Sequence, residues 1–159
     1  MSIPKNYLEA LGRISVNFAQ LEFELFFLIG RLSDTDQDAA RVISEQMTFR
    51  SKCELVDSLC KLRLKKESRL KEAASLVRDL NAVRIKRNRL LHSTWGTGEG
   101  DEVFSAQRKE VVNVKLADLQ QLGDQITEAA RRARRFKGNL MVWFPGLYEE
   151  RREPWTTEN

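Results

Sequence analysis

The sequence predicts an all-α domain in which several long helices pack around one hydrophobic core. Apolar residues recur at steps of three and four positions through most of residues 5–92 and again through residues 117–137, as on one face of a helix. No proline interrupts residues 5–92, and their only glycines are Gly12 and Gly30. A chain of 159 residues, 42% of them hydrophobic, suits a single domain.

The first predicted helix spans residues 5–32. One apolar stripe follows it through Leu8, Leu11, Phe18, Leu21, Leu25, Leu28 and Leu32. Phe23, Phe26 and Phe27 add a second apolar face. A helix with two apolar faces is expected either at the centre of a bundle or in the interface of an oligomer.

A shorter helix is predicted next, because residues 33–36 (Ser-Asp-Thr-Asp) offer oxygens that can cap its start. Asp38 falls in its first turn, where the helix dipole favours a negative charge. After a break at Thr48 or at Arg50–Ser51, helical spacing of apolar residues resumes at Cys53.

A third long helix is predicted from Glu67 to about His92. Residues 95–101 hold three glycines in five positions, which predicts a turn. Residues 102–115 alternate loosely between apolar and polar, so we expect a short loop or a β-hairpin before the last helix.

The last helix is predicted from Ala117 to Lys137, with Gly138 just beyond its end. We therefore expect a bundle over residues 1–138 and a tail over residues 139–159. Residues 140–144 are too apolar to lie free in water, so the tail is expected to dock on its own bundle or, less often, on a partner subunit.

Basic residues are concentrated in the middle of the chain. Residues 50–90 hold 13 basic and 5 acidic side chains, a net charge of +8 in a chain whose total is +4. Such a segment suggests a polyanionic partner such as RNA, because lysine and arginine neutralise phosphates and release counterions. The alternative explanation is an ordinary solvated helix face.

The protein is expected to be soluble and cytoplasmic, because no basic leader precedes an apolar segment and no apolar stretch is long enough for a bilayer. Cys53 and Cys60 lie seven residues apart, about 10 Å along a helix, which is too far for a disulfide. They are expected to be buried thiols in a reducing compartment. Two separated cysteines and one histidine cannot build a zinc site, and no metal or cofactor is expected.

The segment with most chemical potential lies at the end of the third long helix. Asn88 and His92 are four residues apart and share a helical face, and the guanidinium of Arg87 can reach the same point. These groups fit RNA cleavage without metal. His92 would exchange a proton, Arg87 would stabilise the negative charge on the phosphorane oxygens, and Asn88 would orient the histidine or the phosphate. The alternative makes Arg87 a surface charge, Asn88 a polar helix end and His92 a cap on the helix dipole.

Other residues near this segment could bind RNA. Arg84, Lys86 and Arg89 could contact phosphates, and Trp95 could stack on a base, although such a tryptophan more often covers the end of a bundle. The basic cluster at 131–137 could also hold RNA, although a helix C-terminus favours cations in any case.

Glu22 and Glu24 point apart on an ideal helix and do not make an acid/base pair. Glu22 lies on the apolar stripe, so it is expected to be buried against a basic partner such as Arg84 or Arg87.

The six residues 87–92 (Arg-Asn-Arg-Leu-Leu-His), at the end of a long helix, resemble the Arg-polar-x-x-x-His motif of the HEPN superfamily. The stretches 18–22 (Phe-Ala-Gln-Leu-Glu) and 49–52 (Phe-Arg-Ser-Lys) are similar to small bacterial HEPN-like proteins. The resemblance covers about residues 5–137. It implies an up-and-down bundle of four or five helices, a homodimer that brings two motifs into one cleft, and a metal-independent endoribonuclease with Arg87, Asn88 and His92 as its catalytic residues.

Members of this family often act as toxins or in defence against phage, so an antitoxin protein is a possible partner. HEPN toxins that pair with nucleotidyltransferase antitoxins typically have a tyrosine two places after the histidine. Thr94 stands there, which argues against that pairing. Many HEPN domains have lost activity, so a non-catalytic RNA-binding or protein-interaction module is the rival hypothesis, and a scaffold that only dimerises is a weaker third one.

Overall fold

The helices predicted from the apolar spacing are present in the computed structural model, which describes residues 2–98, 102–107 and 110–144. Within these residues the helices are α1 (Lys5–Ser33), α2 (Gln37–Glu45), α3 (Phe49–Arg63), α4 (Glu67–Leu91) and α5 (Leu116–Trp143). Three short strands, β1 (Thr94–Thr97), β2 (Val103–Gln107) and β3 (Glu110–Asn113), lie between α4 and α5. The predicted all-α bundle with a hairpin before the last helix is confirmed.

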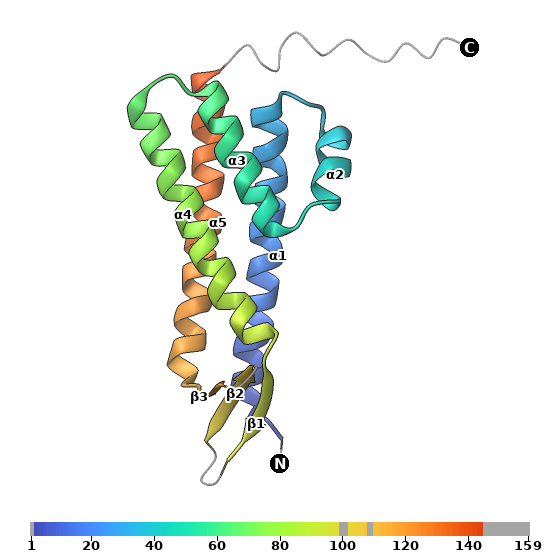
Figure 1. The fold of residues 1–159 in the computed structure, drawn as a ribbon, viewed down its shortest axis with the longest axis vertical. Coiled ribbons are helices and arrows are strands. Elements are labelled where there is room, and N and C mark those ends of the chain that lie inside the picture. The colour runs from blue at the N-terminus through green and yellow to red at the C-terminus, as the bar shows by residue number, and fades with distance from the viewer. Residues whose placement is uncertain (1, 99–101, 108–109, 145–159) are drawn as a thin grey trace, which may run out of the picture.

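Each helix runs antiparallel to the helix before it, and the sheet lies at the end of the bundle where α4 finishes and α5 begins (Figure 1). As a result α1 and α5 run parallel, side by side. Contacts along them keep the same order in both helices: Arg13 bonds Asp124, Asn17 bonds Thr127, and Glu24 bonds Arg134. This seam joins the two ends of the chain.

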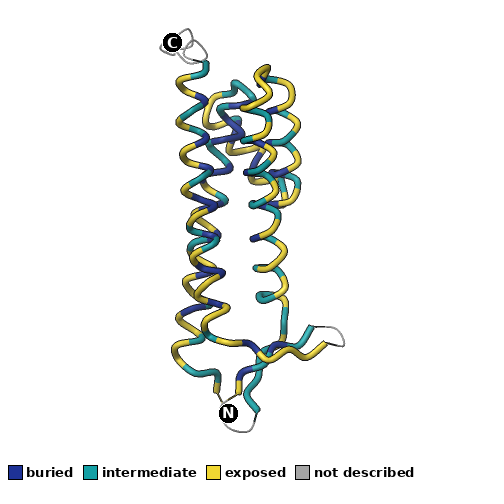
Figure 2. Tube along the Cα trace, turned by 90° about the vertical axis from the view of Figure 1, so that its left-hand side faces the viewer, coloured by how far each residue is buried: buried dark blue, intermediate teal, exposed yellow. Residues whose placement is uncertain are grey.

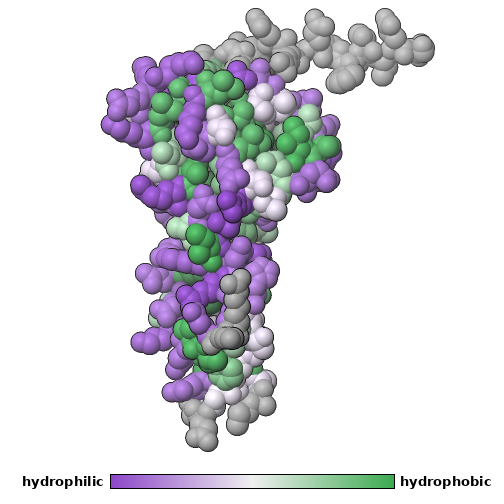
Figure 3. Space-filling view, viewed as in Figure 1, coloured by the Kyte–Doolittle hydropathy of each residue, from purple (hydrophilic) through white to green (hydrophobic). Residues whose placement is uncertain are grey.

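The hydrophobic core runs along the inner faces of the helices (Figure 2). Its largest fully buried side chains are Ile14, Leu21, Leu25, Leu28, Ile29, Val56, Leu64, Leu76, Leu80, Leu119, Ile126 and Phe136. Hydrophilic side chains cover much of the face seen in Figure 3, and apolar atoms gather over α2, where Val42 and Ile43 are exposed. From Phe18 to Leu32 the predicted apolar stripe of α1 is a core face, but Leu8 is 55% exposed, and Ala10 and Ile14 face the core at that end.

The second apolar face of α1 is not buried within the chain. Phe23 is 57% exposed, and its ring packs edge-on against Phe27 with the centroids 4.7 Å apart. Phe26 completes the cluster at 4.7 Å from Phe27. The other sides of α1 contact α2, α3 and α5, so the helix is also central in the bundle.

The predicted cap of α2 is confirmed, and the break predicted at Thr48 or at Arg50–Ser51 falls at Thr48. The carboxylate of Asp36 accepts a hydrogen bond from the backbone N–H of Ala39 at 2.7 Å, which caps α2. The hydroxyl of Thr48 accepts from the N–H of Ser51 at 3.1 Å, which caps α3. Each cap satisfies a backbone donor that has no partner inside the helix.

The expected turn at residues 95–101 is partly wrong, because Thr94–Thr97 forms the strand β1. It pairs antiparallel with β2, which in turn pairs with β3 as predicted for the hairpin. Gly96 lies opposite Phe104, whose ring occupies the space that a side chain on Gly96 would need. The glycine therefore lets the Phe104 ring lie close to the backbone of β1 and does not mark a turn.

The predicted end of the last helix is also wrong. Helix α5 continues through Gly138 to Trp143, and Leu140 is buried. Trp143 and Phe144 pack against the core. Burial of these side chains offsets the cost of about 1 kcal/mol for a glycine inside a helix. The expected tail thus begins as helix up to Trp143, and its residues 145–159 lie outside the described part of the chain.

The expected burial of Glu22 is wrong, and Glu24 is the buried acid. The side chain of Glu22 is 38% exposed and pairs with Lys52 of α3 at 3.3 Å, not with Arg84 or Arg87. Glu24 is only 4% exposed and accepts hydrogen bonds from Arg134 and Lys137 at 2.8 and 2.9 Å. The reason is that α5 covers the side of α1 that carries Glu24.

A candidate nucleic-acid groove at the end of α4

Asn88 and His92 both line an open groove between the last turns of α4 and the sheet. The groove encloses about 820 Å³ and is also lined by Arg84, Ile85, Arg89, Gln107 and Glu110. His92 is exposed and forms the C-cap of α4, its backbone N–H donating to the carbonyl of Asn88 at 3.1 Å. The helical spacing of four residues places the two side chains on one face, as expected.

Arg87 does not line this groove. Its guanidinium lies 4.5 Å from the centre of the Phe18 ring of α1, a cation–π contact. Its Nη1 donates a hydrogen bond to the side-chain oxygen of Asn88 at 3.1 Å. Its Nε is buried and has no hydrogen-bond partner among the described residues. The three residues therefore form a chain in which Arg87 contacts Asn88, and Asn88 shares the groove with His92.

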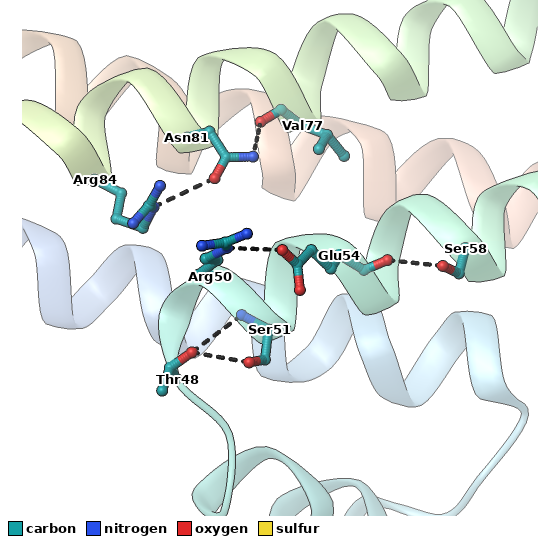
Figure 4. Close-up of polar contacts among 8 residues, drawn as sticks. All are labelled: Thr48, Arg50, Ser51, Glu54, Ser58, Val77, Asn81 and Arg84. Carbon is teal, nitrogen blue, oxygen red and sulfur yellow. Dashed lines mark hydrogen bonds and ion pairs between the residues drawn. The ribbon is translucent and has the colours of Figure 1, made fainter.

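Two of the predicted RNA contacts lie in the groove. Arg84 lines it and donates to the side-chain oxygen of Asn81 at 3.3 Å, one turn earlier on α4 (Figure 4). Arg89 lines it from the other side and forms an ion pair with Glu110 of β3 at 3.1 Å, in which the arginine side chain stays 58% exposed. Two permanent positive charges therefore flank the side chains of Asn88 and His92.

The other two predicted contacts have different roles. Lys86 points to α5 and donates to the side-chain oxygen of Gln125 at 2.9 Å. Trp95 donates its indole N–H to the carbonyl of Leu90 at 3.0 Å and packs against the core. The tryptophan thus covers the end of the bundle and is not a free stacking surface.

Gln107 and Glu110 are groove residues that the sequence pattern did not reveal. They face each other across the paired ends of β2 and β3, which fold back over α4. Their position depends on the sheet register, and Glu110 follows its arginine partner by 21 residues. The alternation of residues 102–115 predicted a hairpin but could not show which side chains meet α4.

Charged side chains outside the groove are mostly paired. In the basic cluster of α5, Arg131 pairs with Glu128, and Arg132 pairs with Asp79 of α4. Arg134 and Lys137 hold Glu24. The cluster does not stand at a helix C-terminus, because α5 extends to Trp143. The Arg131 pair lies within α5, and the other three pairs hold α5 against α1 and α4.

Burial raises the pKa of the Cys53 thiol to about 12 and that of Cys60 to about 12 as well. Both thiols are free and buried, as predicted. Because the thiolate is the reactive form, neither cysteine is a candidate nucleophile at neutral pH.

Among the described residues no three side chains of His, Cys, Asp or Glu are placed to hold a metal ion. The groove itself presents imidazole, guanidinium, amide and carboxylate groups.

In the described ranges every helix is either too short or not apolar enough to cross a membrane. The chain matches no family model, no curated protein and no solved structure. The groove and its residues are therefore the observations from which a function can be inferred.

Proposed function

We propose that the protein is a metal-independent endoribonuclease of the HEPN type, with the groove at the end of α4 as its site. The observation that carries the proposal is that the side chains of Asn88 and His92 line the same groove, which Arg84 and Arg89 also line. A phosphodiester strand fits such a groove because guanidinium groups bind phosphate through two parallel hydrogen bonds.

The chemistry follows from the groups available. The ribose 2′-oxygen loses its proton to an imidazole and forms a bond to phosphorus. The bond from phosphorus to the 5′-oxygen then breaks, and that oxygen takes a proton from an imidazolium. The products are a 2′,3′-cyclic phosphate and a free 5′-hydroxyl. Arg84 and Arg89 stabilise the negative charge that develops on the phosphoryl oxygens.

Arg87 acts in this proposal through Asn88. Its hydrogen bond holds the oxygen of the Asn88 amide, so the amide nitrogen is left to donate into the groove. Arg87 is thus a positioning residue in the single chain, whereas the sequence pattern alone assigned it direct contact with phosphate.

The chain holds a single histidine, and the cleavage needs both a proton acceptor and a proton donor. A homodimer that brings two copies of His92 into one cleft would supply both. The role as a toxin or in phage defence, and an antitoxin partner, belong to the same proposal through the resemblance of residues 87–92.

The test is cleavage of single-stranded RNA by the purified protein in EDTA. We expect products with 2′,3′-cyclic phosphate ends and their loss in His92→Ala. Arg84→Ala should weaken RNA binding, whereas Arg78→Ala, an exposed arginine of the same helix outside the groove, should not. If a folded His92→Ala protein cleaved RNA as fast as the wild type, the proposed endoribonuclease site would be refuted.

The second candidate is a non-catalytic RNA-binding module, and the placement of Arg87 outside the groove favours it. It predicts RNA binding that weakens as salt rises, no cleavage products, and equal affinity in His92→Ala. The same two measurements, binding and product analysis, therefore separate the two functions.

A further inference from the structure

A second hollow lies next to the groove, between α4, the sheet and α5. It encloses about 290 Å³, at the lower end of the roughly 300–1,000 Å³ typical of small-molecule sites. Leu90 of α4, Val112 of β3 and Leu122 of α5 supply its apolar walls. A cavity of this size and lining suits one flat ring system with polar edges.

Ser105 of β2 is the unusual residue in this hollow. It lines the hollow, is only 7% exposed, and its hydroxyl has no hydrogen-bond partner among the described residues. Its oxygen is not one of the fully buried polar atoms without a partner in the described chain, which are Arg87 Nε and Thr97 Oγ1, so it is open to a partner that enters the hollow. A ligand atom in the hollow would be that partner.

Cations and amides stand at the edge of the same hollow. Lys86 and Arg89 line it, and the bond from Lys86 to the side-chain oxygen of Gln125 leaves the NH₂ of that amide free to donate. Apolar walls, a buried hydroxyl, a free amide donor and two cations match the parts of a nucleotide: ring faces, ring edge and phosphate.

Arg89 borders both this hollow and the groove that holds Asn88 and His92. A phosphate on Arg89 would therefore join a strand lying in the groove to a base lying in the hollow. We propose that the hollow receives one base of the RNA strand bound in the groove, next to the cleaved bond. This inference rests on the proposed function and adds a base preference to it.

Asp118 of α5 also lines the hollow and sets which bases fit. Its carboxylate accepts hydrogen bonds and donates none, so it favours a base with an exocyclic amino group, as adenine, cytosine and guanine have, over uracil, which has none. Uracil has carbonyl oxygens in place of the amino group and offers the carboxylate only its ring N–H.

The experiment measures the affinity of fluorescein-labelled 2′-O-methyl octanucleotides of A, C or U by fluorescence anisotropy at one fixed salt concentration. These strands lack the attacking hydroxyl and stay intact. We expect the wild-type protein to bind A and C roughly threefold to tenfold more tightly than U, the worth of one hydrogen bond. Asp118→Asn and Ser105→Val should bring the three affinities within about twofold of each other.

Asp124→Asn is the matched control, because Asp124 is an exposed acid of the same helix that lies outside the hollow and pairs with Arg13. It should keep the wild-type preference. Equal affinities in the wild type, or a preference that survives both hollow variants, would overturn the inference. So would displacement of the A strand by an equal nucleotide concentration of free AMP, which would assign the hollow to a free nucleotide.

Cleavage in EDTA is scored separately with unmodified RNA. If the protein prefers A and C but does not cleave RNA, the base-binding role of the hollow stands and the endoribonuclease proposal fails. If it cleaves RNA but binds the three strands equally, the endoribonuclease proposal stands and the base-binding role of the hollow fails. The two proposals can thus fail independently.

Discussion

Replacing Glu24 by glutamine tests the seam between α1 and α5. The side chain keeps its shape and loses its charge, so Arg134 and Lys137 lose the carboxylate that they share. Breaking a fully buried ion pair costs about 3–5 kcal/mol. Here Lys137 is 24% exposed and Arg134 is 61% exposed, so water can solvate both cations after the change. We therefore expect a loss of about 1–3 kcal/mol in the free energy of unfolding.

The loss should depend on pH in a defined direction. Burial by itself raises the pKa of Glu24, but the hydrogen bonds and charges of Lys137 and Arg134 outweigh it and hold the pKa below its ordinary value. A carboxylate with a lowered folded pKa adds stability above its unfolded pKa and loses it as the pH falls through the folded value. The difference between wild type and Glu24→Gln should be largest at neutral pH and shrink below about pH 4.

Urea unfolding followed by circular dichroism at several pH values measures both effects. Glu9→Gln is the matched control, because Glu9 is an exposed acid of the same helix whose partner Lys5 lies 3.7 Å away with 90% of its side chain exposed. That variant should change stability by less than about 0.5 kcal/mol. If Glu24→Gln behaved like Glu9→Gln at neutral pH, the buried ion pair would not be holding the seam.

Two further predictions test the fold. Gly138→Ala should raise the free energy of unfolding by about 0.5–1 kcal/mol, because Gly138 lies inside α5 and an added methyl group meets nothing within 4 Å; a loss of stability in chemical denaturation would contradict the continuous helix. In the folded protein at pH 8, Cys53 and Cys60 should react with a thiol reagent on the order of a thousandfold more slowly than in urea, since burial raises each pKa to about 12. Fast labelling of the native protein would show that the thiols are accessible.

The helices could be predicted because each one carries its own apolar period. The oxygen of Asp36 also marked the start of α2, since capping is a contact between near neighbours in the sequence. The sequence does not predict the end of α5, because Gly138 resembles a local stop whereas the burial of Leu140 carries the helix past it. Local signals thus failed where a tertiary contact outweighed them.

In the candidate site, too, the local relations could be predicted from the sequence and the tertiary ones could not. Asn88 and His92 share a groove because helical spacing alone sets their relation. The direction of Arg87 depends on the ring of Phe18, 69 positions earlier in the chain, and the acid opposite Arg89 comes from β3. Neither relation has a periodic signature. The sequence therefore located the segment and its chemistry but not which cations enter the groove.

The parallel seam of α1 and α5 has a consequence for how the chain folds as it is made. Asn17 and Thr127 are 110 positions apart, so α1 meets its principal neighbour only after the residues between them have left the ribosome. Until then the apolar face around Leu21 has only α2 and α3 to cover it. Such distant contacts slow folding and leave apolar surface of α1 exposed during synthesis until α5 emerges.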